Sequence, residues 1–187
     1  MEEKKEMDET KDANLAKVVN NEAPAKDAKS KVYALFGKLG IKYRVVEHPP
    51  IFTEEDNKKH GIQIDSVIFK NLFLRNKNKS RYYLVSLPLE KKADLAALQA
   101  RLGETRLSFG SEADLWDKLA ITHGSVSLLN IIGVGKTDVI HVIDKTLFDS
   151  GTIAVHPNDN TATIIFEPKE LARIYEHYGV DFRFSEI

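Results

Sequence analysis

The sequence predicts one mixed α/β domain preceded by a charged extension, and three observations lead to that prediction. The chain has 187 residues, 42% of them hydrophobic, which is enough to bury a core without disulfides. Segments of helical and of alternating hydrophobic periodicity interleave without strict βαβ order. Residues 1–30 contain no aromatic residue and carry 6 lysines and 8 acidic residues. We therefore divide the chain into an extension, residues 1–29, and a domain, residues 30–187.

The extension is too charged to form a core of its own. Its few apolar residues cannot offset the entropy lost on ordering, so we expect a disordered segment. The alternative is an arm that docks on a partner, since Leu15, Val18 and Val19 share a helical spacing. No secretory signal or transit peptide is recognisable, and no apolar run approaches the roughly 20 residues of a membrane span. We expect a cytoplasmic protein with no membrane partner.

Five helices are predicted, four of them from apolar residues that recur every three or four positions. Ser30 and Ser111 are the expected caps of two of these helices. In the helix after Ser111, Leu115 and Trp116 are expected to face the core. The predicted ranges are 30–39, 53–61, 94–102, 111–119 and 168–178.

Strands are predicted where polar and apolar residues alternate, or where a short apolar run lies between turn residues. Two of them, 67–74 and 82–87, flank the polar turn 76–79 (NKNK), which indicates a hairpin. The other predicted strands are 41–45, 139–143, 162–166 and 181–184.

Several common catalytic and cofactor motifs are absent from the sequence. The chain has no cysteine, which excludes thiol catalysis, iron–sulfur clusters and cysteine-based zinc sites. The stretch 133–137 (GVGKT) is similar to a phosphate-binding loop, but that loop needs a glycine where the chain has Asn130. The six histidines include no pair spaced by four residues, and no nucleophile elbow is present. We predict neither a metal nor a cofactor.

A lysine and an asparagine stand side by side in an otherwise apolar strand. Lys70 and Asn71 lie between Phe69 and Phe73, and neighbours on a strand face opposite ways. If Lys70 points inward among the phenylalanines, its desolvation is costly unless an anionic or strongly polar ligand binds it. The alternative is an edge-strand lysine whose ammonium reaches water.

Two further stretches place polar or small residues where a cleft could be lined. In the turn 156–161 (HPNDNT), His156 and Asn160 could project into a cleft, although proline and asparagine also serve ordinary turns. Gly124 and Ser125 begin a run of small residues that allows a ligand to approach the backbone closely.

Eight basic residues flank the predicted hairpin and are candidates for contacts with phosphates. Outside residues 1–30 the chain has 21 basic and 20 acidic residues, so any contact with nucleic acid must be local. The eight residues are Lys58, Lys59, Arg75, Lys77, Lys79, Arg81, Lys91 and Lys92.

The stretches singled out above occur in the order and at the spacing of a known family. Together with residues 43–53 (YRVVEHPPIFT), they resemble the YbaK/ProX superfamily of aminoacyl-tRNA editing domains, over residues 30–187. Within it the chain is most similar to the branch of free-standing prolyl-tRNA editing proteins. The resemblance implies a single compact domain with a mixed, strongly curved β-sheet flanked by helices. It also implies a hydrolase that removes alanine from mischarged tRNA(Pro).

The same resemblance implies a candidate site and partners. It places the family's essential lysine at Lys70, with further catalytic elements at Gly124, Ser125 and His156. The implied partner is the acceptor end of tRNA(Pro). We expect the extension to contact prolyl-tRNA synthetase or another synthetase-complex component. The implied substrate-binding residues are Thr53, Phe69, Asn71 and Asn160.

Two residues depart from the family pattern and leave the amino-acid specificity open. The family usually has prolines where this chain has His123 and Leu128, on either side of the Gly-Ser loop. One alternative is therefore a deacylase for another aminoacyl-tRNA, such as seryl- or threonyl-tRNA. Another is a non-catalytic module of the same fold that binds tRNA or a synthetase, although the intact Lys70 favours an enzyme.

Overall fold

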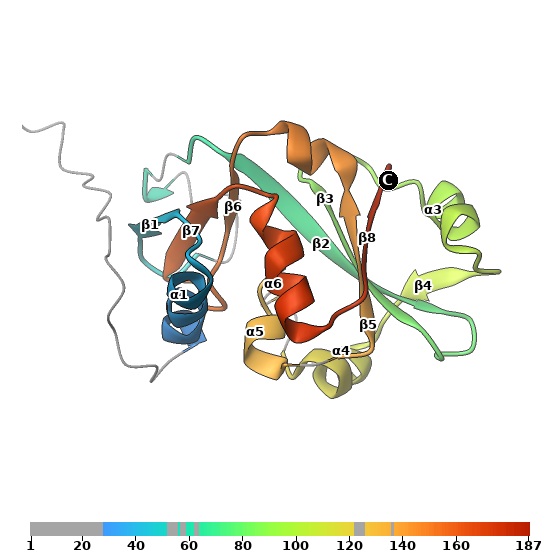
Figure 1. Cartoon of the computed structure of the whole chain (residues 1–187). Helices are drawn as coiled ribbons and strands as arrows, with labels where there is room; N and C mark the ends of the chain where they lie inside the picture. The colour runs from blue at the N-terminus through green and yellow to red at the C-terminus, as the bar shows by residue number, and fades with distance from the viewer. Residues whose placement is uncertain (1–27, 52–55, 57–58, 62–63, 122–125, 136) are drawn as a thin grey trace, which may run out of the picture.

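A long strand, β2 (Val67–Asn76), belongs to both halves of a mixed sheet (Figure 1). Its first residues, Val67 and Ile68, pair in parallel with β6 (Ile153–Val155). Residues 69–75 pair antiparallel with β3 (Tyr82–Pro88). The structure is a computed structural model that describes residues 28–51, 56, 59–61, 64–121, 126–135 and 137–187.

Each half of the sheet has its own pattern of strand pairing. On one side of β2, β1 (Tyr43–Glu47), β7 (Ala162–Phe166) and β6 pair antiparallel in that order. On the other side, β3, β5 (Val139–Asp144) and β8 (Phe182–Ser185) pair in parallel. The short β4 (Leu107–Phe109) pairs with the far end of β2. The predicted mixed sheet is confirmed, with eight strands in the described part of the chain.

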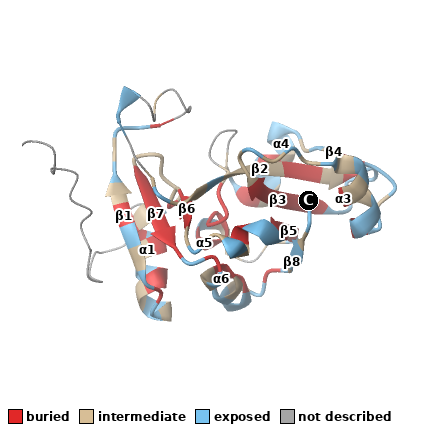
Figure 2. Ribbon diagram, turned by 90° about the horizontal axis from the view of Figure 1, so that it is seen from above, coloured by how far each residue is buried: buried red, intermediate tan, exposed pale blue. Residues whose placement is uncertain are grey.

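Helices cover the sheet, and no helix in the described residues is long and apolar enough to cross a membrane. Figure 2 shows the buried residues concentrated on central strands such as β7 and β3. The helices are α1 (Ala28–Leu39), α3 (Leu95–Leu102), α4 (Glu112–Leu119), α5 (Ile131–Val134) and α6 (Glu170–Tyr178), with a 3-10 helix at Lys145–Asp149.

The core consists of three apolar clusters that follow the two faces of β2. The largest contains Phe36 of α1 and residues of α5, α6, β6 and β7. A second cluster packs Leu74 of β2 with Leu98 of α3. The third packs Phe73 of β2 with Leu115 of α4. Adjacent residues of β2 therefore face different helices, as the alternation of a strand requires.

Most predicted elements are found within a few residues of their expected ends, but two details were wrong. Ser30 does not cap the first helix, because α1 begins at Ala28 and buries Ser30 in its first turn. Trp116 does not face the core: it is 61% exposed, because α4 turns Leu115 and Leu119 inward instead. Most of the predicted helix 53–61 lies outside the described residues.

One histidine is buried in the sheet without a hydrogen-bond partner. His141 of β5 is fully buried, and within the described residues neither ring nitrogen is hydrogen-bonded. Its ring packs edge-on against Tyr175, 4.7 Å away between centroids. Burial lowers the pKa of His141 from its ordinary 6.5 to about 4. Below pH 6.5 the unfolded chain therefore binds a proton at His141, whereas the folded chain does so only as the pH approaches 4. Acid thus stabilises the unfolded state relative to the folded state.

We predict that His141→Leu makes the protein less sensitive to acid. As the pH falls from 7 to 4, the wild type loses roughly 2–3 kcal/mol of unfolding free energy through this group, and the variant does not. Urea denaturation at both pH values measures the difference. His177→Gln, a change at an exposed histidine of α6, is expected to keep the wild-type dependence. Equal losses in wild type and His141→Leu would contradict the prediction.

Candidate active site

The candidate site lies where one edge of β2 is left without a neighbouring strand. On the side away from β3, β6 pairs only with residues 67–68 and β4 only with residues 74–76. Within the described residues, no strand pairs with this edge over residues 69–73. This gap contains the Lys70–Asn71 pair singled out from the sequence.

Asn71 tethers a chain segment to this part of β2. Its Nδ2 donates a hydrogen bond to the carbonyl of Val126 (2.9 Å), and its Oδ1 accepts one from Ser86 Oγ (2.6 Å). Ser86 lies opposite Asn71 on β3 and is fully buried. Asn71 therefore fixes the residue that directly follows the predicted Gly124-Ser125 loop, which itself lies outside the described residues.

The same segment is held from its other side by the turn after β6. Ser127 Oγ donates a hydrogen bond to the carbonyl of His156 (2.9 Å). Asn158 Nδ2 donates to the carbonyl of Leu129 (2.9 Å). These contacts connect Asn71, the 126–129 segment and His156 into one contiguous group.

His156 is mostly buried and lies beside a second histidine. The ring centroids of His156 and His48 are 5.9 Å apart. His48 is held in place by Thr163, whose Oγ1 lies 2.9 Å from its Nε2. Burial, followed by the neighbouring His48, lowers the pKa of His156 below its ordinary value. The His156 imidazole is therefore neutral at pH 7 and can accept a hydrogen bond or a proton.

Lys70 does not point inward among the phenylalanines. Alternation along β2 places it on the face opposite Phe69 and Phe73, and its side chain is half-buried rather than free in water. Its Nζ donates a hydrogen bond to the carbonyl of Leu89 (2.9 Å). Within the described residues this is the hydrogen bond found for the ammonium, which has three N–H donors.

The remaining predicted site residues are placed as follows. Phe69 packs against the largest core cluster. The backbone carbonyl of Asn160 accepts a hydrogen bond from Ile51 N (3.0 Å), which brings the turn after β6 beside the segment leading to Thr53. Thr53, like Gly124 and Ser125, lies outside the described residues. Across the described residues, no hydrogen bond joins Lys70 to His156 or Asn160.

The structure also explains one of the two departures from the family pattern. Leu128 is fully buried in the largest core cluster, and its carbonyl accepts a hydrogen bond from Tyr175 (3.2 Å). The side chain that replaces a proline therefore contributes to the core. The other departure, His123, lies outside the described residues.

Half of the eight basic residues proposed for phosphate contacts are ion-paired within the fold. Lys59, Lys77 and Lys92 are exposed, and Lys58 lies outside the described residues. The pairs are Arg75–Asp114 (3.9 Å), Lys79–Asp114 (3.5 Å), Arg81–Glu104 (3.3 Å) and Lys91–Asp144 (2.7 Å).

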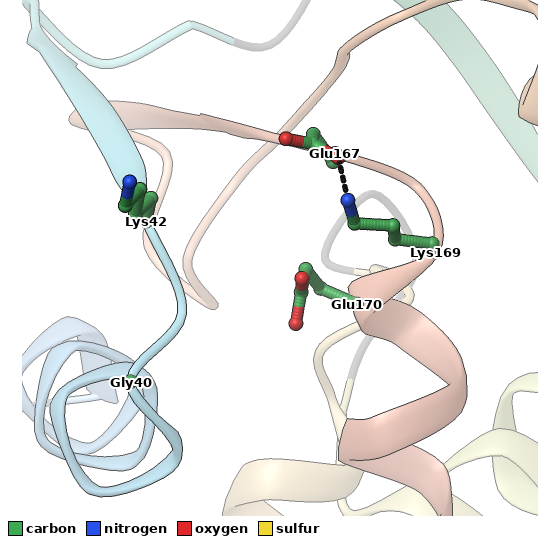
Figure 3. Close-up of a pocket in the computed structure, with 5 residues that line it drawn as sticks. All are labelled: Gly40, Lys42, Glu167, Lys169 and Glu170. Atoms are coloured by element: carbon green, nitrogen blue, oxygen red, sulfur yellow. Dashed lines mark ion pairs between the residues drawn. The ribbon is translucent and has the colours of Figure 1, made fainter.

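Two surface hollows of the described chain lie away from these residues. The smaller, about 230 Å³, lies between the start of β1, the end of β7 and the start of α6 (Figure 3). It contains an ion pair between Lys169 and Glu167. The other, about 300 Å³, lies between α1, α5 and α6. No predicted site residue lines either hollow. The described residues contain no group of three or more histidine, aspartate or glutamate side chains that could hold a metal ion.

The chain matches known proteins over most of its length. A family model described as the aminoacyl-tRNA editing domain matches residues 48–174. The prolyl-tRNA editing protein ProX of Acetoanaerobium sticklandii is 38% identical over 161 residues, which cover 86% of this chain and 98% of that protein. The prolyl-tRNA synthetase associated domain-containing protein 1 of Danio rerio is 32% identical over 152 residues, covering 80% of this chain and 82% of that protein.

A solved structure confirms the predicted fold. It is the crystal structure of a candidate trans-editing enzyme for prolyl-tRNA synthetase, with a TM-score of 0.61 and 18% identity. The match covers 88% of this chain and 99% of that one. The sequence relatives confirm the predicted enzyme class, an aminoacyl-tRNA deacylase. With a family model matching more than half of its length, the chain belongs to the aminoacyl-tRNA editing domain family.

Proposed function

We propose that this protein deacylates mischarged tRNA in trans, with Ala-tRNA(Pro) as its substrate and Lys70 at the centre of the reaction. The observation that carries the proposal is the half-buried Lys70 in the stretch of β2 that pairs only with β3 in the described part of the chain. The 38% identity to a prolyl-tRNA editing protein supports the choice of substrate. The site binds the acceptor end of tRNA(Pro), and the reaction takes place in the cytoplasm.

An aminoacyl ester is already activated, so its hydrolysis needs a positioned water and stabilisation of the developing oxyanion. Lys70 supplies positive charge for the ester carbonyl or for the 3′-terminal phosphate. Backbone N–H groups at Gly124 and Ser125 add contacts to the oxyanion or the amino acid. The neutral His156, with the 2′-hydroxyl of the substrate, accepts a hydrogen bond from the attacking water. No nucleophilic side chain is required.

Selectivity follows from the size of the amino acid. A pocket that holds alanine excludes the bulkier proline by steric clash, whereas a synthetase cannot reject a smaller amino acid by clash alone. Thr53 and Asn160 are the residues we assign to this pocket. Leu128 does not alter it directly, since its side chain is buried in the core.

We further propose that the extension, residues 1–29, lies outside the catalytic domain of residues 30–187 except for Ala28 and Lys29, which belong to α1. Its excess of acidic residues makes it a candidate contact for prolyl-tRNA synthetase or another synthetase-complex component.

The first prediction from this proposal concerns Lys70. The wild type is expected to hydrolyse Ala-tRNA(Pro) and to leave Pro-tRNA(Pro) intact. Loss of the ammonium in Lys70→Ala removes charge stabilisation in the transition state and is expected to slow deacylation by about 100-fold or more. Release of labelled alanine or proline measures the hydrolysis of each substrate by the wild type and by Lys70→Ala. Lys42→Ala, a change at an exposed lysine beside the hollow of Figure 3, serves as the control.

Two results would overturn parts of this proposal. Full activity in Lys70→Ala would remove Lys70 from the reaction. No hydrolysis of Ala-tRNA(Pro) by the wild type would reject the substrate, and a panel that includes seryl- and threonyl-tRNA would then identify the correct one or reveal a binding module.

The second prediction concerns the pH dependence set by His156. Because burial lowers the pKa of His156, its imidazole stays neutral at a pH where a free histidine is already protonated. The single-turnover rate is therefore expected to decline only at a more acidic pH than the titration of a free histidine. In His156→Gln this acidic decline is expected to vanish together with part of the rate. His177→Gln should retain the wild-type profile. An unchanged acidic decline in His156→Gln would assign it to another group.

The third prediction separates the two hydrogen bonds of Asn71. Asn71→Asp keeps the acceptor for Ser86 but loses the donor to Val126, so the 126–129 segment loses its hydrogen bond to β2. We expect about tenfold or greater loss of the single-turnover rate, since small misplacements of catalytic groups are costly. Ser86→Ala loses only the other bond and is expected to lose less activity. Equal rates in both variants would argue against a tether that serves catalysis.

A further inference from the structure

The carbonyl that accepts the hydrogen bond from Lys70 is that of Leu89, in a turn that is itself held by hydrogen bonds. Leu89 follows β3, and its N–H donates to the carbonyl of Ile68 on β2 (3.1 Å). The N–H of Lys91 donates to the carbonyl of Pro88 (3.0 Å), which closes the turn 88–91. The carbonyl of Leu89 inside this turn accepts the hydrogen bond from Lys70 Nζ.

The far end of the turn is fixed by an ion pair with a buried carboxylate. Lys91 Nζ donates to Asp144 Oδ2 at 2.7 Å, and the Asp144 side chain is fully buried at the end of β5. Asp144 also accepts hydrogen bonds from Thr146 N (2.9 Å), Thr146 Oγ1 (2.6 Å) and Ile187 N (3.1 Å). Burial alone would raise the pKa of Asp144, but the hydrogen bonds from Lys91, Thr146 and Ile187 outweigh it, and the net pKa is lowered.

Such a pair is better suited to fixing a position than to adding stability. Desolvation offsets most of the attraction, so a buried ion pair is often no more stabilising than apolar residues of the same volume. Its hydrogen bond nevertheless fixes both distance and direction. Here that direction determines where residue 91 lies, and residue 91 is two positions from the carbonyl that orients Lys70.

We propose that Lys91 and Asp144 are positioning residues for deacylation: their ion pair holds the 88–91 turn, and the Leu89 carbonyl in this turn fixes the position of the Lys70 ammonium. Neither residue touches the substrate. The inference rests on the role proposed above for Lys70, and it extends the site from β2 to the end of β5.

The first test follows the Lys70 ammonium without measuring activity. In the full chain with 13Cε/15Nζ-labelled lysine, the NMR signal of Lys70 is the one missing from Lys70→Arg. Lys91→Met and Asp144→Asn are both expected to shift this signal. Lys118→Met removes a lysine of α4 that is paired with Asp138 at 2.9 Å, and it is expected to leave the signal in place. An unshifted Lys70 signal in both Lys91→Met and Asp144→Asn would overturn the proposal.

The second test measures single-turnover deacylation at saturating enzyme, below the melting temperature of each variant. Both variants are expected to lose about 10- to 100-fold, as misplaced catalytic groups do, whereas Lys118→Met keeps the wild-type rate. Asp144→Asn retains the charge of Lys91, so a loss in this variant cannot come from a missing contact between Lys91 and tRNA. In a Lys70→Ala background, Lys91→Met is expected to cost nothing further.

The outcomes separate this inference from the proposed function. Rates that fall only in proportion to the unfolded fraction would make the pair merely structural and would overturn the inference. If Lys91→Met or Asp144→Asn does not fold, the double variant Lys91→Met/Asp144→Leu replaces it. This variant also lacks the ion pair that positions the turn, but it leaves no unpaired charge buried. A fully active Lys70→Ala would remove Lys70 from the proposed reaction, while the NMR measurement would still decide whether the ion pair positions Lys70.

Discussion

The site depends on the way in which β2 changes partners along its length. A strand shared by two halves of a sheet leaves one partner before it meets the next. Here the pairing with β6 ends at Ile68, and the pairing with β4 begins at Leu74, six residues further along β2. The edge between them has backbone groups that no strand satisfies, and such groups need other partners. Gly110 N reaches the carbonyl of Phe73 at the β4 end (2.9 Å). The rest of the gap is where loops, and by our proposal the substrate, can approach.

The alternation of β2 then explains why a lysine and an asparagine are neighbours in an apolar strand. Asn71 lies on the face covered by α4 and is bonded to Val126 and Ser86. Lys70 lies on the face covered by α3 and is bonded to the Leu89 carbonyl. Two successive residues therefore fix two segments that are far apart in the chain, one on each face of β2.

The sequence predicted those parts of the fold that have a local signal. The 111–119 helix is capped by Ser111 as expected, and the hairpin is present. The strands β4 and β6 and the helix α5 were missed because three or four residues show no periodicity. The predicted hairpin turn, residues 76–79, is centred one residue earlier than the observed turn. The pairing that follows from the predicted turn would place Asn71 opposite Leu84, whereas the structure places it opposite Ser86. The partners of Lys70 and Lys91 could not be predicted, because they depend on packing between distant segments.

The contacts that hold the site share one chemical feature, which suits the reaction. Lys70, Asn71 and Ser127 each donate to a backbone carbonyl, namely that of Leu89, Val126 and His156. A carbonyl fixes where a segment lies whatever side chain it carries, so the side chains of Leu89 and Val126 can change while the position is kept. An activated ester needs groups in the right place more than a strong nucleophile. An arrangement that controls backbone position therefore provides what the hydrolysis of an aminoacyl ester requires.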